Sequence, residues 1–142
     1  MILVLLLVMA ALGRGSAAES DQREQMNEVQ LLARIIAAEA RGEPLAGQVA
    51  VGAVILNRMQ DPAFPNTLSG VIFQPNAFES VSNGLFYRRS PTNQEIRAAL
   101  TALNGWDPTY GSIYFWEPAK STSRWIWSRQ VVRRIGGHLF AR

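Results

Sequence analysis

The order of helical and strand-like segments predicts an α+β fold, mainly helical in its N-terminal part and with a small antiparallel sheet in the C-terminal third. Three observations carry this prediction. Apolar residues recur with helical spacing before residue 60, a complete helix-capping pattern precedes Ile96, and short β-like runs follow Asp107. With 142 residues, 48% of them hydrophobic and 18% charged, the chain has room for one domain with an apolar core.

The N-terminus has the pattern of a secretory signal peptide. Residues 2–12 form an unbroken apolar run, and small residues fill positions 16–18, as in an h-region followed by a cleavage site. A run of eleven apolar residues is too short to cross a bilayer as a helix. We therefore expect residues 1–18 to direct export to the periplasm or cell wall, without stable membrane insertion after their removal. The alternative is an uncleaved N-terminal anchor.

The next segment separates this leader from the folded part of the chain. Residues 19–27 are polar and show no apolar period, which predicts a linker. Asn27 would cap the first helix, and residues 28–142 would form one domain.

The composition excludes several kinds of chemistry. The chain has no Cys and a single His, which leaves no thiol nucleophile and no Cys/His zinc cluster. It contains no Gly-rich phosphate loop, Ser elbow or HExxH motif, so we expect no metal and no cofactor. The net charge of +3 suits contact with an anionic polymer such as a bacterial wall and does not indicate nucleic acid. The oligomeric state stays open.

The helix predicted from residue 28 carries a carboxylate on its apolar side. Glu39 lies four residues after Ile35 and three after Ile36, which places it beside the buried face. Burial disfavours the ionised form, so we expect the pKa of Glu39 to be raised toward the range of a general acid. The alternative is a half-exposed Glu near Arg41 without chemistry. The apolar positions of the helix are Val29, Leu32, Ala33, Ile36, Ala37 and Ala40.

Two further helices are predicted before residue 74. Pro44 suits a first helical turn, so a second helix should cover residues 45–58. Its small residues would let it approach the first helix closely. After a Pro-rich turn, Asn66 or Thr67 can cap a short helix through residues 71–73.

The middle of the chain is predicted to be a loop followed by a helix. Residues 74–89 show no clean period, and Asn83-Gly84 is a turn signal, so we expect a binding loop that walls a cleft. Residues 92–95 fit a capping box, and the helix that they start should end at residues 104–105.

Short β-like runs and aromatic residues mark the last third of the chain. Trp125 and Trp127 would share one face of a strand, and rings beside polar loops suit a glycan groove. The alternative is that the Trp residues form the core of a small sheet. His138 is expected to be a strand or C-terminal surface histidine rather than a base, because its sequence neighbours include no acid to orient it. The predicted strands cover residues 112–116, 124–127, 131–135 and 138–140.

The carboxylates leave two kinds of mechanism open. A hydrolytic glycosidase usually uses two carboxylates roughly 5 to 9 Å apart. Glu43 follows Glu39 by four residues, but the helix end between them leaves their relative placement open. Glu79, Asp107 and Glu117 lie in predicted loops. A single essential Glu would require a mechanism other than hydrolysis.

Four motifs in the same order resemble one known family. They are LLARIIAAEARGEPLAGQVAVGAVILNRM, FPNTLSGVIFQPNAFESV, ALNGWDP and STSRWIWSRQVVRRIGGHLFAR. Together they closely resemble the catalytic domain of spore cortex-lytic and cell wall hydrolases of the SleB/CwlJ type, over nearly all of residues 31–142. The resemblance implies a lysozyme-like α+β domain that acts on peptidoglycan glycan strands, with SleB-type members working as lytic transglycosylases.

The resemblance also implies roles for individual residues. The catalytic acid of the AAEARGE motif falls on Glu39, which would protonate the oxygen between N-acetylmuramic acid and N-acetylglucosamine. The same group would then act as base on the muramic C6 hydroxyl, which attacks C1 and closes a 1,6-anhydro ring. The motif positions expected around the substrate groove are Glu43, Gln74, Phe78, Tyr114 and Trp127.

Two departures from the family are expected to bear on substrate preference. Glu117 stands where an uncharged Asn is expected, and these 142 residues contain no separate peptidoglycan-binding module. A role in spores and a role in general wall remodelling therefore both stay open. Two other functions also stay open. A hydrolytic N-acetylmuramidase would use Glu43 as the first candidate for a second carboxylate, and a non-catalytic wall-binding domain would not need Glu39.

Overall fold

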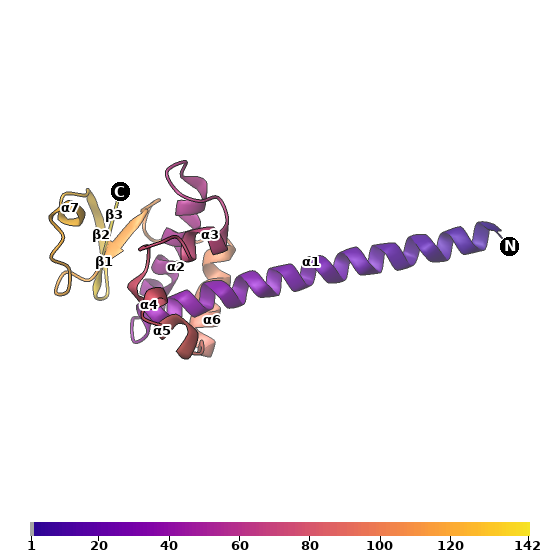
Figure 1. The fold of residues 1–142 in the computed structure, drawn as a ribbon, viewed down its shortest axis with the longest axis horizontal. Helices are drawn as coiled ribbons and strands as arrows, with labels where there is room; N and C mark the ends of the chain where they lie inside the picture. The colour runs from indigo at the N-terminus through magenta and orange to yellow at the C-terminus, as the bar shows by residue number, and fades with distance from the viewer. Residues whose placement is uncertain (1) are drawn as a thin grey trace.

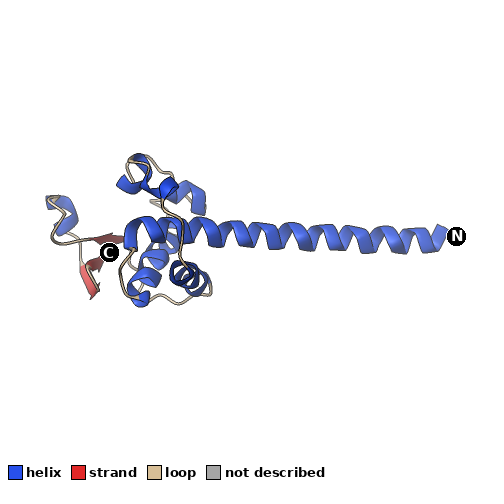
Figure 2. Cartoon of the chain, turned by 90° about the horizontal axis from the view of Figure 1, so that it is seen from below, coloured by secondary structure: helices blue, strands red, loops and turns tan. Residues whose placement is uncertain are grey.

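The computed structural model describes residues 2–142, and it describes side-chain surroundings from residue 15 onward (Figure 1). Helices fill the N-terminal part and a three-stranded antiparallel sheet lies in the C-terminal third, so the predicted α+β fold is confirmed. The sheet stands at one end of the helical body, and the first half of helix α1 (Ile2–Ala40) extends from the other end (Figure 2). Most of the predicted signal peptide lies outside the described side chains.

Helix α1 continues without a break through residues 19–27, so the prediction that the first helix begins after this segment is wrong. Asn27 lies inside the helix and not at its N-cap. This stretch contains no Gly or Pro and is exposed on all sides, which leaves no apolar stripe for periodicity to detect. Within the described residues, no helix combines the length and the apolarity that crossing a membrane requires.

The helical core forms where α1, α2 (Leu45–Gln60) and α6 (Asn93–Leu103) meet. A Cβ atom at Gly52 of α2 would lie 3.1 Å from Ile36 Cδ1 and 3.2 Å from Ala102 Cβ. The predicted close approach of the second helix to the first is therefore confirmed, and α6 joins it at the same point. The fully buried side chains of this core include Leu32, Ile35, Ile36, Val49, Val54, Ile55, Val71, Ile72 and Ala98.

The segment between α2 and α6 contains three short helices. Thr67 caps the first of them, α3 (Leu68–Ile72), by accepting a hydrogen bond from the Gly70 N–H at 3.0 Å, as predicted. The predicted loop at residues 74–89 is not wholly irregular, because it contains two single-turn helices that are too short to show an apolar period. These are α4 (Glu79–Ser82) and α5 (Leu85–Arg88), joined at the predicted Asn83-Gly84 turn.

Helix α6 begins at the predicted capping box, and its Glu95 also makes a tertiary ion pair. The Glu95 carboxylate accepts a hydrogen bond from the Thr92 N–H at 2.6 Å and two more, both 2.9 Å, from the Arg41 guanidinium. Glu95 is 1% exposed. Burial alone would raise its pKa, but the hydrogen bonds from Arg41 and Thr92 outweigh burial and lower the pKa of Glu95. The ion pair fixes the end of α1 against the start of α6.

The sheet consists of β1 (Tyr114–Trp116), β2 (Val131–Ile135) and β3 (His138–Ala141), with β3 in the centre. The antiparallel register pairs Trp116 with Leu139, so the residue after β1, Glu117, comes to lie opposite His138. This strand pairing brings together two residues, Glu117 and His138, that are distant in the sequence.

The strand predicted at residues 124–127 is wrong, because this segment forms a single-turn helix, α7 (Arg124–Trp127). Ser123 caps it by accepting a hydrogen bond from the Ile126 N–H at 3.3 Å. Trp125 and Trp127 therefore do not share the face of a strand. The Ser before the aromatic run is the sequence signal for this cap.

Replacing Glu95 with Gln should lower the free energy of unfolding at pH 7 by about 1–3 kcal/mol, because the amide loses charged hydrogen bonds at a buried site. Since the pKa of Glu95 is lowered in the folded state, its contribution is present above the ordinary Glu pKa and is lost as the pH falls through the folded value. The difference between wild type and Glu95→Gln, measured by urea denaturation, should therefore shrink toward pH 3. The exposed Glu24→Gln serves as control, and an equal difference at both pH values would contradict the prediction.

Candidate functional site

The last turn of α1 holds Glu39 in a partly buried position against the segment that follows α3. Its Oε1 accepts a hydrogen bond from the Ser80 hydroxyl at 2.7 Å. Burial is the largest influence and raises the pKa of Glu39; Glu117 and Glu79 raise it further, while Ser80 and Arg58 act in the opposite direction. The net effect is a raised pKa, as the helical spacing predicted. This is the state that a general acid requires near neutral pH.

Arg58, near the end of α2, is the cation beside this acid. It is 8% exposed, and its Nε donates a hydrogen bond to the Ile113 carbonyl at 2.8 Å. Its guanidinium lies 5.4 Å from the ring centroid of Phe78 and 5.9 Å from that of Tyr114. Burial lowers the pKa of Arg58, whereas Tyr114 and Glu39 raise it. The structure thus brings Glu39, Phe78 and Tyr114, all predicted site residues, around one buried arginine.

A buried histidine with two carboxylates beside it adjoins this cluster through the sheet. The buried His138 of β3 lies between two carboxylates, with Nδ1 3.8 Å from Glu43 Oε1 and Nε2 3.8 Å from Glu117 Oε1. Among the described residues, its Nδ1 has no hydrogen-bond partner. Burial lowers the pKa of His138, and the two carboxylates only partly oppose this. His138 thus lies in a strand, one of the two predicted placements, and not at the surface. The expectation that no acid lies beside it is wrong, because the acids come from distant parts of the chain.

Glu43 docks the turn after α1 onto the β2–β3 hairpin. Its Oε2 accepts a hydrogen bond from the Gly137 N–H at 3.0 Å. A Cβ at Gly136 would lie 2.1 Å from the same oxygen, and a Cβ at Gly137 would lie 2.7 Å from Oε1. The carboxylate of Glu43 thus occupies space that only two successive glycines leave free. This contact suits a residue that positions the sheet, and the prediction that Glu43 binds substrate stays a prediction.

Two other predicted site residues, Gln74 and Trp127, are not among the contacts of Glu39 and Arg58 described above. Gln74 is partly buried between α3 and α4. Trp127 is 46% exposed, and its ring packs edge-on against Trp116 at 5.6 Å between centroids. Trp116 itself is buried, whereas Trp125 is exposed and packs edge-on against Tyr114 at 5.2 Å. The aromatic residues therefore divide between the core of the sheet and an exposed surface next to Tyr114.

Sequence reasoning missed three polar residues of this site: Arg58, Ser80 and His138. Arg58 follows Val54 and Ile55 by four and three residues, so the buried face of α2 contained a signal for it. Ser80 lies in a segment without periodicity, and the partners of His138 depend on strand register. No local pattern marks either of these two.

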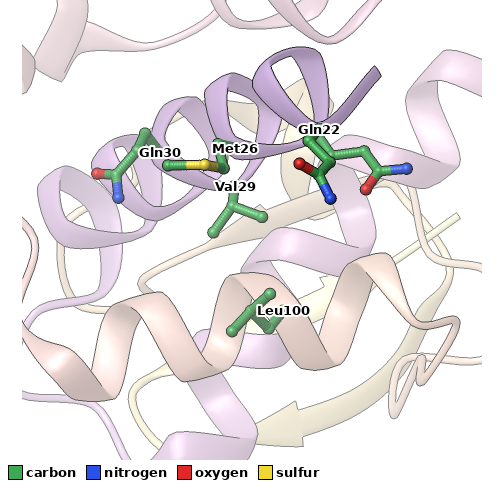
Figure 3. Close-up of a pocket in the computed structure, with 6 residues that line it drawn as sticks. Gln22, Met26, Val29, Gln30 and Leu100 are labelled. Carbon is green, nitrogen blue, oxygen red and sulfur yellow. The ribbon is translucent and has the colours of Figure 1, made fainter. Parts of the chain in front are cut away.

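An apolar hollow elsewhere on the molecule does not take part in this arrangement. It lies between α1 and α6, has a volume of about 380 Å³, and is bordered by Met26, Val29, Leu100 and glutamine side chains (Figure 3). Its nearest member in sequence, Gln30, precedes Glu39 by nine residues, or about 13 Å along a helix. None of its residues is titratable, so the hollow offers no group for acid–base chemistry.

Comparison with known proteins places the chain in a family. The family model described as Cell Wall Hydrolase matches residues 42–141. The chain belongs to the cell wall hydrolase family. The resemblance drawn from the four sequence motifs is thereby confirmed. The matched range of the cell wall hydrolase model begins three residues after Glu39.

The relatives of this cell wall hydrolase include enzymes of two names. The chain is 49% identical over 116 residues to the spore cortex-lytic enzyme of Bacillus cereus, covering 82% of this chain and 44% of that protein. It is 33% identical over 120 residues to the cell wall hydrolase CwlJ of Bacillus subtilis, covering 80% and 83% of the two chains. The chain therefore spans less than half the length of the spore cortex-lytic enzyme that it matches.

Two solved structures share the fold. The catalytic domain of SleB from Bacillus cereus matches with a TM-score of 0.76 and 49% identity, covering 82% of this chain and 91% of that one. The catalytic domain of the germination-specific lytic transglycosylase SleB from Bacillus anthracis matches with a TM-score of 0.76 and 48% identity, covering 82% and 94%.

The hydrogen bond from Ser80 should measurably limit the pKa of Glu39. Ser80→Ala removes a donor that stabilises the ionised carboxylate, so the pKa of Glu39 should rise further. The measurement is an NMR titration of the glutamate side-chain carboxyl carbons. Ser82→Ala, at an exposed hydroxyl that bonds the Glu79 carbonyl, is the matched control. A pKa that stays constant or falls in Ser80→Ala would contradict this assignment.

The docking of Glu43 can be tested at the hairpin. Gly111 and Gly136 both have positive φ, +80° and +56°, but a Cβ at Gly111 would meet nothing within 4 Å. Gly111→Ala should lower the free energy of unfolding by about 1–2 kcal/mol through backbone strain alone. Gly136→Ala should lower it by about 1–2 kcal/mol more, because its methyl group displaces the Glu43 carboxylate and breaks the hydrogen bond from the Gly137 N–H.

The readout is the free energy of unfolding of both alanine variants in wild-type and Glu43→Ala backgrounds. The excess cost of Gly136→Ala should shrink when Glu43 is absent, leaving the part caused by Pro44 Cδ, which would lie 3.0 Å from the new Cβ. An excess that persists undiminished without Glu43 would mean that the carboxylate is not what Gly136 accommodates.

Proposed function

We propose that this chain is a peptidoglycan-cleaving glycosidase, a lytic transglycosylase that cuts the bond between N-acetylmuramic acid and N-acetylglucosamine. The observation that carries the proposal is the state of Glu39: it is partly buried, its pKa is raised, and the arginine that acts on its charge, Arg58, packs against the rings of Phe78 and Tyr114. The names of the relatives, spore cortex-lytic enzyme and cell wall hydrolase, support the same substrate.

Glu39 would act twice in this reaction. Its carboxylic acid first donates a proton to the glycosidic oxygen, and the bond from that oxygen to muramic C1 breaks. The resulting carboxylate, which Ser80 and Arg58 favour, then accepts the proton of the muramic C6 hydroxyl as its oxygen bonds to C1. The products are a glycan end with a 1,6-anhydro ring and a free N-acetylglucosamine hydroxyl, and Glu39 is again protonated. The cycle consumes no water and requires no metal.

The aromatic residues next to this acid would hold the glycan strand. Tyr114 is partly exposed, and the exposed Trp125 and Trp127 extend the aromatic surface along α7, whereas Phe78 is buried and supports Arg58. Rings of this kind stack on the apolar faces of sugars. Gln74 would contribute an amide for sugar hydroxyls from the neighbouring loop.

The division of the chain follows from the same proposal. Residues 28–142 would form the cell wall hydrolase catalytic domain, and residues 1–18 a signal peptide for export to the periplasm or cell wall. Residues 19–27 would connect them, although they do so as part of helix α1. Relatives whose names refer to the spore cortex and the cell wall support a substrate outside the cytoplasm.

Replacing Glu39 with Gln should abolish cleavage, because the amide keeps the shape of the side chain and cannot donate the proton. We expect kcat/KM to fall by about 10²-fold or more. The measurement is mass spectrometry of soluble fragments released from purified peptidoglycan. Wild type should release fragments that end in 1,6-anhydromuramic acid, which are lighter by one water than hydrolysis products.

Glu28→Gln is the matched control, since Glu28 lies on the exposed part of the same helix. Its fragments should equal those of wild type. Undiminished release by Glu39→Gln would disprove the central role of this residue, and no release by wild type from any wall preparation would favour a binding domain.

A further inference from the structure

Glu117 is a carboxylate that the ring-closing reaction does not use. It follows β1 directly, and its side chain is 34% exposed, so solvent can reach it. Its two oxygens face different neighbours: the Lys120 ammonium is 3.0 Å from Oε2, and Nε2 of the buried His138, whose pKa is lowered, is 3.8 Å from Oε1. The ion pair with Lys120 involves Oε2, while Oε1 lies beyond hydrogen-bond distance of the histidine.

The packing of β1 brings Glu117 to the side of the molecule that holds Glu39. The ring of Phe115, two residues before Glu117, stacks on the ring of Phe78 at 6.3 Å between centroids. Phe78 in turn lies two residues before Ser80, which donates its hydrogen bond to Glu39. The stacking of Phe115 on Phe78 thus sets β1 against the N-cap residue of the helix that carries Ser80. The charge of Glu117 acts on Glu39 from this side and raises its pKa.

We infer that Glu117 is a second carboxylate of the active site and that it diverts part of the cleavage from ring closure to hydrolysis. This inference rests on the proposed function. A carboxylate near the acid, but separate from it, is the group that activates water in hydrolytic glycosidases.

The two outcomes share their first step and differ in the second. Glu39 donates its proton to the glycosidic oxygen, and the bond to muramic C1 breaks. In the diverted reaction the oxygen of a water molecule bonds to C1, and one proton of that water passes to the Glu117 carboxylate. The product is a muramic acid with a reducing end, and exchange with solvent returns the proton from Glu117 to Glu39. No other reactant is needed.

The other acidic neighbours are less suited to this role. Glu43 is engaged by the Gly137 N–H and packs into the space beside Gly136. Glu79 also raises the pKa of Glu39, but it lies exposed in the first turn of α4.

The test measures the ratio of reducing to 1,6-anhydro muramic ends among the fragments that the full chain releases from purified peptidoglycan. Glu117→Gln keeps the size of the side chain and removes the base, so the ratio should fall about tenfold or more relative to wild type. Glu117→Asn should do the same. Glu79→Gln is the matched control, because it removes the other carboxylate that raises the pKa of Glu39, and it should leave the ratio unchanged.

A purely structural role for Glu117 would lower both products together, so the ratio separates the two explanations. The inference is overturned if wild type releases only anhydro ends, if both Glu117 variants keep the wild-type ratio, or if Glu79→Gln shifts the ratio equally. In each of these cases, loss of all release in Glu39→Gln would leave the proposed function intact. Thermal melting of each variant identifies any that fail to fold.

Discussion

The hydrogen bond from Ser80 to Glu39 joins two helices whose positions are determined in different ways. Glu39 belongs to the longest helix and is placed by the packing of α1 against α2 and α6, whereas Ser80 belongs to a single-turn helix. Such a short helix has little stability of its own, so its position depends on what it contacts. Phe78 provides that support, because it is 5% exposed and packs against Arg58 and Phe115. The acid, its donor and the sheet are thus one packed unit.

Holding an acid in this setting has a thermodynamic cost. Because the pKa of Glu39 is raised in the folded state, the unfolded chain ionises it more readily, and the folded state is disfavoured as the pH rises above the ordinary Glu value. Arg58 adds a second cost, since burial lowers its pKa. Its bond to the Ile113 carbonyl and its contacts with three aromatic rings offset part of this. The surroundings of Glu39 and Arg58 therefore destabilise the folded state locally, and burial of the apolar core offsets this cost.

Sequence patterns predicted the helices in which buried residues recur at a regular spacing. The helix carrying Glu39, the second helix and the capped helix α6 all follow from such patterns, and so does the raised pKa of Glu39. The predictions were wrong for segments in which buried residues do not recur at a regular spacing. An exposed helix over residues 19–27 has no apolar stripe, and the single turn at α7 is too short to differ from a strand. The two carboxylates beside His138 could not be predicted from the sequence, because folding rather than sequence proximity brings Glu43 and Glu117 next to it.

The contact between Glu43 and the hairpin links positions 94 residues apart in the chain. An oxygen of Glu43 stands where a side chain at either glycine would begin, so the three positions are not independent. A larger residue at 137 would fit only beside a shorter residue at 43, whereas the positive φ of Gly136 favours glycine there even when residue 43 is short. In an alignment of homologous chains, columns 43 and 137 should therefore vary together. Their covariation would reflect how the sheet is seated on the helices, even in members whose surface aromatic residues have diverged.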